Sequence, residues 1–233
     1  MLHYETISPH LLSVLKRIQS LPDVSRFRLV GGTSLSLQIG HRISVDIDLF
    51  TDKSFDITEL QKTLDKTFDS FEVVWANKNG FVSTIDNIKV DFFDWHIPFI
   101  KDLINEDGIC LAHMEDIGAM KLEAITSRKE KKDFIDIMFL LRKYSLTDLL
   151  SAHKVKYPYM STKFVIESLL AVDFADNTEP PKMIIPYDWQ NEKSFIIKTV
   201  NNYLSGLKEG VIKQQEDRIM KAEELLRKKN RKS

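Results

Sequence analysis

The sequence predicts an α+β protein in which a mixed β-sheet with flanking helices is followed by a C-terminal helical half. Two observations support this prediction. Segments with strand-like alternation and segments with helical periodicity alternate as far as about residue 110, and the pattern is then helical almost to the end. We therefore expect an α/β domain over residues 1–110 and a helical domain with a basic C-terminal helix over residues 111–233.

The elements of the first half follow from spacing and turn residues. Ser8 and Pro9 are typical of an N-cap and a first helical position, and leucines then recur at helical spacing. Asp56 is a plausible cap of a later helix. Strands are expected at residues 27–30, 45–51, 71–76, 81–85 and 88–94, with a short helix at 33–39. This order implies a mixed sheet with helices on one side.

The second half is expected to contain helices at residues 116–128, 133–144 and 189–204, followed by a charged, helix-prone segment at 209–233. From Arg218 onward there are seven Lys or Arg and two Glu. This basic end has two interpretations. It is either a solvated terminal helix or a contact to RNA phosphates, which would make binding strongly salt-dependent.

Composition excludes several classes of protein. The formal net charge of -1 provides no global attraction to nucleic acid or to a membrane. The longest apolar run is five residues, at 137–141, so no membrane span is expected. The N-terminus does not resemble a signal peptide. A single cysteine, Cys110, cannot form an internal disulfide, and a reduced, cytoplasmic setting is expected.

Two aspartates alternate with apolar residues in the segment 45–51. On a strand, Asp46 and Asp48 share one face, whereas Val45, Ile47 and Leu49 face the core. Neighbouring carboxylates repel each other unless a cation lies between them or one is protonated. Mg²⁺ suits this arrangement because it usually takes one or two carboxylates and leaves positions for substrate phosphates. By itself, the pair is equally compatible with an edge strand that has a solvated polar face.

A pair of glycines, Gly31 and Gly32, precedes the aspartates at the end of a strand. Glycines let backbone N–H groups approach an anion closely, and a helix starting at Thr33 or Ser34 would direct its positive end the same way. The alternative is a simple tight turn. Together with the carboxylates, the glycines predict a site for a metal-bound nucleoside triphosphate.

A third carboxylate is available on the strand expected at 88–94. Lys89, Asp91 and Phe93 share one face of that strand. If it runs beside residues 45–51, Asp91 completes a triad and either binds the metal or takes a proton from an attacking hydroxyl. Asp94, on the opposite face, is the weaker candidate.

These motifs resemble those of known nucleotidyltransferases. The order of Gly-Gly, about a dozen residues, Asp-hydrophobic-Asp and a later strand aspartate resembles the polymerase-β-type nucleotidyltransferase superfold. GGTSLSLQIGHRISVDIDLF and KLEAITSRKEKKDFIDIMFLL resemble the AbiEii/AbiGii toxin family, which includes MenT-type toxins. DFADNTEPPKMIIPYDW resembles a segment of some bacterial members. The resemblance covers roughly residues 5–205.

The resemblance implies roles for the matched residues. Asp46 and Asp48, with Asp91, would hold Mg²⁺ or Mn²⁺, and Lys121 would neutralise charge on the transferred phosphate. Asp133, in a KD-xx-D context with Asp136, matches the later catalytic aspartate. The expected nucleotide-binding residues are Gly31, Gly32, Thr33, Ser34, Arg42, Ser44 and Arg128. Many relatives have Gly-Ser where this chain has Gly-Gly, so Thr33 or Ser34 would have to supply the hydroxyl.

Without the resemblance, the same residues have simpler interpretations. Lys121 and Arg128 are seven apart and therefore share a helical face, where lone basic residues are usually solvated. Asp133 could be the N-cap of the following helix. His41 is expected to orient Asp46 or to line the nucleotide pocket, and not to bind a metal.

The predicted reaction transfers a nucleotidyl group from an NTP to an acceptor hydroxyl and releases pyrophosphate. The resemblance implies the 3′ end of tRNA as acceptor, growth arrest, and an antitoxin encoded nearby in a type IV-like system. One alternative is a small-molecule nucleotidyltransferase of the aminoglycoside-modifying type, which needs an acidic acceptor pocket. The other is a non-catalytic nucleotide- or RNA-binding protein, against which the retained aspartates and Lys121 argue.

Overall fold

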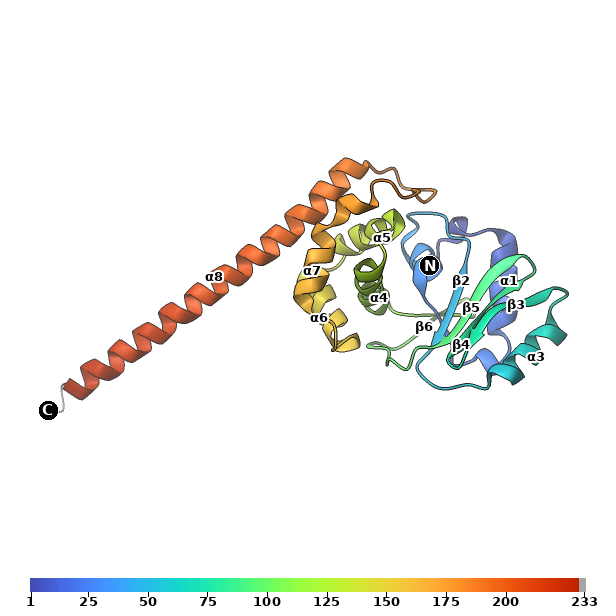
Figure 1. Cartoon of the computed structure of the whole chain (residues 1–233), viewed down its shortest axis with the longest axis horizontal. Coiled ribbons are helices and arrows are strands. Elements are labelled where there is room, and N and C mark those ends of the chain that lie inside the picture. The colour runs from blue at the N-terminus through green and yellow to red at the C-terminus, as the bar shows by residue number, and fades with distance from the viewer. Residues whose placement is uncertain (231–233) are drawn as a thin grey trace.

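A seven-stranded mixed sheet and a cluster of helices lie side by side in the computed structural model, which describes residues 1–230 (Figure 1). The strands are β1 (Arg28–Leu29), β2 (Ile47–Thr51), β3 (Phe71–Asn77), β4 (Gly80–Ile85), β5 (Ile88–Asp94), β6 (Ile104–Glu106) and β7 (Ile109–Leu111). The helices are α1 (Pro9–Gln19), α2 (Gly31–Ile39), α3 (Ile57–Thr67), α4 (Met114–Ser127), α5 (Lys131–Leu141), α6 (Leu146–Lys156), α7 (Thr162–Leu170) and α8 (Trp189–Asn230). The predicted α+β class is confirmed.

The strand order is β3-β4-β5-β2-β1-β7-β6. The β2–β5 and β1–β7 pairs are parallel, and the other pairs are antiparallel. The parallel pairing of β2 with β5 confirms that the two aspartate-bearing strands are neighbours. Because Asp48 lies opposite Asp91 in the register, both carboxylates are on the same face of the sheet.

One face of the sheet is buried under α1 and α3. Ser8 Oγ accepts a hydrogen bond of 3.0 Å from Leu11 N, so the predicted N-cap of α1 is confirmed. Apolar residues of both helices form a core with Ile47, Leu49 and other apolar strand residues. Alternation along the strands therefore directs the carboxylates to the opposite face.

The expectation of helices on one side only is wrong. The core of α4–α8 includes Val30 and packs against Phe50 on the carboxylate side of the sheet. The chain reaches this second face through a short hairpin, β6–β7, that the sequence pattern did not predict. Its turn residues Asp107 and Gly108 have positive φ angles of 53° and 76°. Pairing of β7 with β1 returns the chain to the sheet, and α4, which follows β7, packs against α2.

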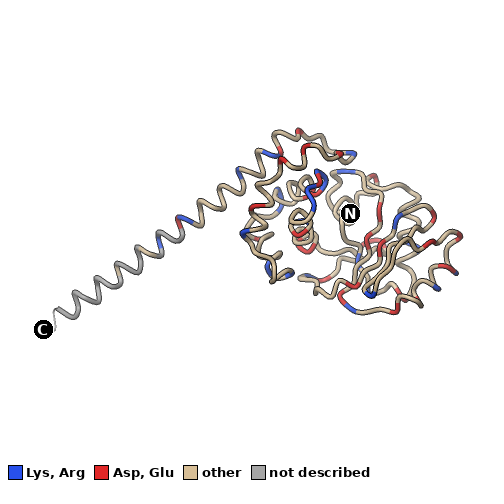
Figure 2. Tube along the Cα trace, in the orientation of Figure 1, with Lys and Arg blue, Asp and Glu red and all other residues tan. Residues whose placement is uncertain are grey.

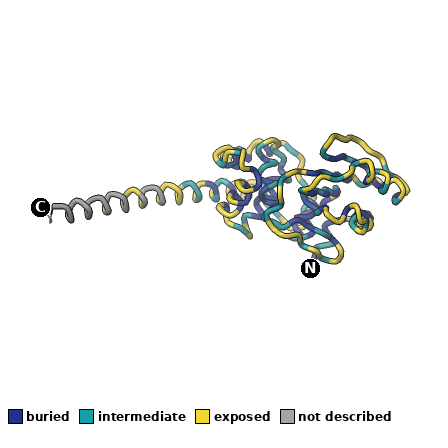
Figure 3. Tube along the Cα trace, turned by 90° about the horizontal axis from the view of Figure 1, so that it is seen from below, coloured by how far each residue is buried: buried dark blue, intermediate teal, exposed yellow. Residues whose placement is uncertain are grey.

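Figure 3 shows the buried residues concentrated in the body of the molecule, from which α8 extends as a single long helix (Figure 1). Its first part contributes Ile196 and Val200 to the helical core. The basic side chains from Arg218 onward lie outside the residues whose side chains are described, and so does their predicted contact with RNA. The division at residue 110 stays a prediction, and β7 runs across it.

No helix within residues 1–230 combines the length and the apolar character that crossing a membrane requires.

Candidate active site

A pocket of about 730 Å³ lies between the carboxylate face of the sheet and α4. It brings together nine of the twelve predicted site residues, namely Gly31, Gly32, Arg42, Ser44, Asp46, Asp48, Asp91, Lys121 and Arg128. The other three, Thr33, Ser34 and Asp133, are not part of its lining. Residues nearly a hundred positions apart in the sequence therefore meet in one site.

Asp46, Asp48 and Asp91 lie on the floor of the pocket. The strand begins at Ile47, two residues later than expected, so Asp46 immediately precedes β2. Val45 was expected to face the core, but it lies outside the strand, is 65% exposed and lines the pocket.

The floor carries excess negative charge. Burial, together with the neighbouring Asp91 carboxylate, raises the pKa of Asp48 from 3.8 to about 6. Lys89 Nζ donates to Asp91 Oδ2 at 2.9 Å, whereas Asp91 Oδ1 is buried and has no hydrogen-bond partner among the described residues. A raised carboxylate pKa and an unpaired buried oxygen are both features that a bound cation would relieve.

The donor set fits a hard divalent cation. Among the described residues, no group of three Asp, Glu, His or Cys side chains is arranged to hold a metal ion. Mg²⁺ does not require such a cage, because it binds through one or two carboxylates together with water and substrate phosphates. The aligned pair Asp48 and Asp91 supplies this number of ligands, and Asp46 is adjacent.

The glycines form the first turn of α2, which begins at Gly31 and not at Thr33 or Ser34 as expected. Gly31 has a φ of 66°, and a Cβ at this position would overlap the Asp48 carboxylate. A Cβ on Gly32 would overlap the Arg42 guanidinium. The two glycines thus let a carboxylate and a cation approach the positive end of α2.

The earlier start of α2 turns the next two side chains inward. Thr33 Oγ1 is buried, lies 2.8 Å from Ser44 Oγ and contacts the Asp46 carbonyl. Ser34 Oγ accepts from Gln38 Nε2 at 3.1 Å. Neither side chain lines the pocket, since Thr33 supports it from behind and Ser34 faces the interior, and their contact with a nucleotide stays a prediction.

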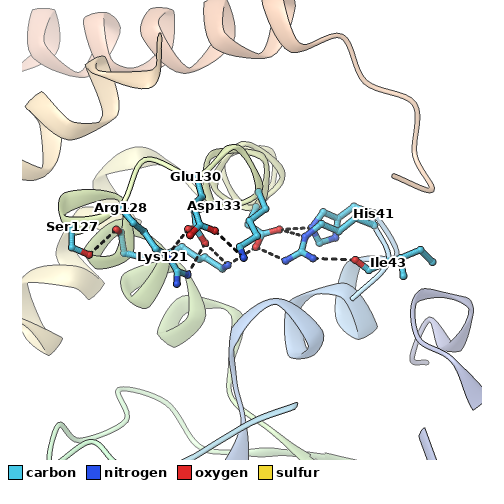
Figure 4. Close-up of polar contacts among 11 residues, drawn as sticks. His41, Ile43, Lys121, Ser127, Arg128, Glu130 and Asp133 are labelled. Carbon is cyan, nitrogen blue, oxygen red and sulfur yellow. Dashed lines mark hydrogen bonds and ion pairs between the residues drawn. The ribbon is translucent and has the colours of Figure 1, made fainter. Parts of the chain in front are cut away.

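A buried cluster of charges forms one wall of the pocket, as Figure 4 shows. Lys121 Nζ lies 2.7 Å from Asp133 Oδ1 and 2.6 Å from Asp136 Oδ2. Arg42 donates to both oxygens of Asp136, from Nε at 2.7 Å and from Nη2 at 2.9 Å. Arg128 Nε donates to Asp133 Oδ2 at 2.8 Å. Three cations therefore surround two carboxylates.

The geometry of this cluster differs from several expectations. Asp133 is fully buried behind Lys121 and Arg128, so it positions these cations and does not itself reach the pocket. It lies in the first turn of α5, whose N-cap is Glu130. Arg128 follows the end of α4 with extended backbone, so it does not share a helical face with Lys121.

His41 also differs from its expected role, because it bonds to Asp136 and not to Asp46. His41 Nε2 lies 2.8 Å from Asp136 Oδ1, and the ring is fully buried outside the pocket lining. Burial lowers the pKa of His41, which favours the neutral ring.

The acidic members of the cluster are ionised. Burial raises the pKa of Asp136, but attraction to Arg42 and Lys121 outweighs it and holds the pKa well below 3.8. Burial also opposes the charge of Lys121, yet Asp136 and Asp133 raise its pKa above 10.5. The cluster therefore keeps a surplus of one positive charge, contributed by side chains that line the pocket.

Several residues of the site were not predicted from the sequence. Asp136 and Lys89 had signals, because Asp136 lies one helical turn after Asp133 and Lys89 shares a strand face with Asp91. Lys182 had none. It enters the pocket because residues 182–185 pair with the loop after α2, where Ile43 N donates to the Lys182 carbonyl at 2.8 Å.

Fold and site together are those of a nucleotidyltransferase: a mixed sheet presents adjacent carboxylates, and a glycine-containing helix start and a cationic wall face them across one pocket. A family model described as "Nucleotidyl transferase AbiEii toxin, Type IV TA system" matches residues 13–203. The chain belongs to the AbiEii family.

Individual proteins are similar to this chain in sequence or in fold. An uncharacterized protein of Aquifex aeolicus (strain VF5) is 34% identical over 196 residues, which cover 82% of this chain and 94% of the relative. The fold is similar to that of MenT4, a nucleotidyltransferase toxin from Mycobacterium tuberculosis H37Rv, with a TM-score of 0.55, 14% identity, and 82% and 83% of the two chains covered. JHP933 from Helicobacter pylori gives a TM-score of 0.51 with 17% identity, covering 90% of this chain and 99% of JHP933.

Proposed function

We propose that this nucleotidyltransferase uses Mg²⁺ to transfer a nucleoside monophosphate from an NTP to the 3′-terminal hydroxyl of tRNA, as the toxin of a type IV toxin–antitoxin system. Asp48 and Asp91, with Asp46, would hold the cation. When bound, Mg²⁺ would neutralise charge on the α-phosphate and orient the triphosphate for in-line attack.

The protein's own groups complete the site. The triphosphate would lie against the N-terminus of α2 and the cationic wall of Arg42, Lys121 and Arg128. Asp133 and Asp136 hold these three side chains in place, so the side chains need to move little as negative charge develops on the triphosphate during transfer. Asp91 is the nearest candidate to accept the proton of the attacking hydroxyl, provided that its bond to Lys89 is exchanged.

The charged side chains that line the pocket support RNA as the acceptor. Six cationic side chains line the pocket, namely Arg42, Lys89, Lys121, Arg128, Lys132 and Lys182. Four acidic side chains line it, Asp46, Asp48, Asp91 and Glu123, and the first three are assigned to the metal. A polycationic acceptor such as an aminoglycoside would meet one remaining carboxylate, Glu123. A polyanion would meet Lys132 and Lys182, the lining cations that engage neither the triphosphate nor Asp91. Figure 2 shows basic residues at the α4–α5 connection, on the side that faces the sheet.

The toxin role and an antitoxin partner rest on the family description and on the resemblance to MenT-type toxins. The nucleotide is left open, because no base-specific contact follows from the lining residues.

The test incubates purified protein with tRNA, Mg²⁺ and each α-labelled NTP in turn. We expect label on tRNA with at least one NTP, and none with Asp46→Asn or Asp48→Asn. Asp65→Asn is the matched control, because Asp65 is exposed on α3, on the opposite side of the sheet. Label on an added aminoglycoside, with none on RNA, would support the small-molecule alternative. Absence of any transfer despite metal-dependent NTP binding would contradict the proposal.

A further inference from the structure

Four aromatic side chains form a continuous row that starts in the pocket and runs across the sheet to its edge. We call Trp95, Phe50, Phe93 and Trp75 the aromatic strip. The ring centroids of Trp95 and Phe50 are 5.1 Å apart with the rings stacked at 18°. Phe50 and Phe93 are 5.9 Å apart, and Phe93 and Trp75 are 6.2 Å apart.

The strip lies on the same face of the sheet as the carboxylates. Phe50 and Phe93 each follow a site aspartate by two residues, Asp48 on β2 and Asp91 on β5. Trp75 on β3 lies opposite Val82 on β4, and Val82 lies opposite Asp91. Phe50 and Trp95 themselves line the pocket. The strip is therefore a direct extension of the site.

Both ends of the strip are open to solvent. Trp75 is 52% exposed and Trp95 is 40% exposed. The helices α1 and α3 pack on the opposite face, where Phe81 and Phe92 are fully buried. Phe50 and Phe93 between them are partly buried. Single exposed apolar residues are ordinary, but a contiguous aromatic row with exposed ends beside a site marks a binding surface.

We propose that the aromatic strip is a stacking platform for the unpaired bases at the 3′ end of a single-stranded RNA acceptor. Aromatic side chains on an open β-sheet bind single strands because every base has a face that can stack on them, whatever the sequence. The inference rests on the proposed function, because an RNA strand that stacks along the strip from Trp75 at the sheet edge would have its 3′-terminal hydroxyl near Asp91. Lys89, exposed on the same face of β5, supplies a cation for the backbone next to the site.

The position of the strip favours RNA over a protein partner. A protein partner that paired with the edge strand β3 would contact mainly the β3 backbone. Such pairing would not explain why the aromatic rings continue past β5 and β2 into the pocket. Glu72 lies on the same face of β3, beyond the strip, and its charge disfavours a path for the RNA in that direction. The backbone of the RNA is therefore expected to follow the strip itself.

The test measures binding of a fluorescently labelled single-stranded RNA with a free 3′-hydroxyl, in the presence of Mg²⁺ and without NTP. Trp75→Leu keeps an apolar side chain but removes the stacking surface, whereas Trp75→Phe retains a ring. We expect Trp75→Leu to weaken RNA binding by about 5- to 150-fold, and Trp75→Phe to retain most of the affinity. Phe174→Leu is the matched control, because Phe174 is 75% exposed and lies away from the sheet in a short helical turn.

The outcomes separate this inference from the proposed function. NTP binding should be unchanged in all three variants, and circular dichroism should report the wild-type fold. Unchanged RNA affinity in Trp75→Leu would overturn the platform even if nucleotidyl transfer to tRNA is observed, and so would equal losses in Trp75→Leu and Trp75→Phe. RNA binding that depends on the ring at position 75, in a protein that transfers nothing to RNA, would instead overturn the proposed function and leave the platform standing.

In the wild type, RNA should also quench tryptophan fluorescence, and an unquenched signal at saturating RNA would contradict stacking.

Discussion

Asp48 is a carboxylate whose surroundings favour its protonated form. It lies opposite Asp91 across two neighbouring strands, beside the first turn of α2. Such an arrangement is unfavourable for folding without a cation and favourable for binding one. Function and stability are therefore opposed at this residue.

Replacing Asp48 with Asn should stabilise the metal-free protein while abolishing transfer. The pKa of Asp48 is raised in the folded state, from 3.8 to about 6. Its contribution to stability is therefore intact below the unfolded pKa, is lost progressively as the pH rises to about 6, and stays lost above that. We expect Asp48→Asn to increase the free energy of unfolding by up to about 3 kcal/mol at pH 7.5, with a smaller gain at pH 5. Thermal unfolding with a chelator present measures this. A variant less stable than wild type at pH 7.5 would contradict the assignment of strain to Asp48.

Part of the site could be predicted at this scale, because strand alternation places Asp46 and Asp48 on one side of their segment and Asp91 on one face of its own strand. That Asp91 lies opposite Asp48 follows from the pairing of β2 with β5. The partners of the basic residues could not be predicted in the same way. Lys121 and Arg128 meet at Asp133 through the turn between two helices, a geometry that helical spacing does not specify.

Among the elements, α2 shows how a small shift in a helix start changes the roles of residues. The Gly-Gly signal marked the right place, but the sequence does not reveal that the glycines are inside the helix. Similarly, the α1 cap and the strand order around β5 follow from local patterns, whereas residues 182–185 reach the loop after α2 through long-range backbone pairing. Such pairing leaves no periodic signal in the sequence.

Replacing Gly31 with Ala should damage both the fold and the site. The positive φ of 66° disfavours any L side chain, and the added Cβ overlaps the Asp48 carboxylate. We expect a loss of about 1–3 kcal/mol in the free energy of unfolding and at least tenfold weaker Mg²⁺-dependent NTP binding. Urea unfolding and NTP titration measure these effects.

Gly206→Ala is the control for this substitution. Gly206 lies within α8, and a Cβ added there would meet no other atom within 4 Å, so alanine should be neutral or stabilise by up to about 1 kcal/mol. Equal effects of the two substitutions would show that the close approach of Gly31 to Asp48 is unimportant.

For the whole molecule, Asp136 connects the two halves of the chain. It is carried by α5, and it accepts hydrogen bonds from His41 and Arg42, which precede β2. Its pairing with Lys121 adds α4 to the same contact. The wall of the pocket is therefore also the junction between the sheet half and the helical half.

Asp136→Asn should destabilise the protein by about 3–5 kcal/mol, because it leaves Arg42 and Lys121 buried without a full counter-charge. The pKa of Asp136 is lowered in the folded state, so its contribution is present above its unfolded pKa of about 4 and is lost as the pH falls through the folded value. The difference from wild type should thus be constant from pH 7 to pH 5 and shrink only in stronger acid. Urea unfolding across this range measures it.

Glu59→Gln removes one partner of an exposed ion pair with Lys62 and serves as the control, with an expected change below about 1 kcal/mol. If Asp136→Asn cost no more than Glu59→Gln, the cluster would not be the junction that the structure indicates.

Nucleotidyl transfer by this pocket can be tested by following the two ends of the triphosphate. Parallel reactions would contain tRNA, Mg²⁺ and the same NTP labelled at the α- or at the γ-phosphate. Nucleotidyl transfer predicts α-label on the RNA and γ-label in released pyrophosphate, with both lost in Asp46→Asn. Recovery of γ-label on the RNA, or as free phosphate with no α-label transferred, would contradict it.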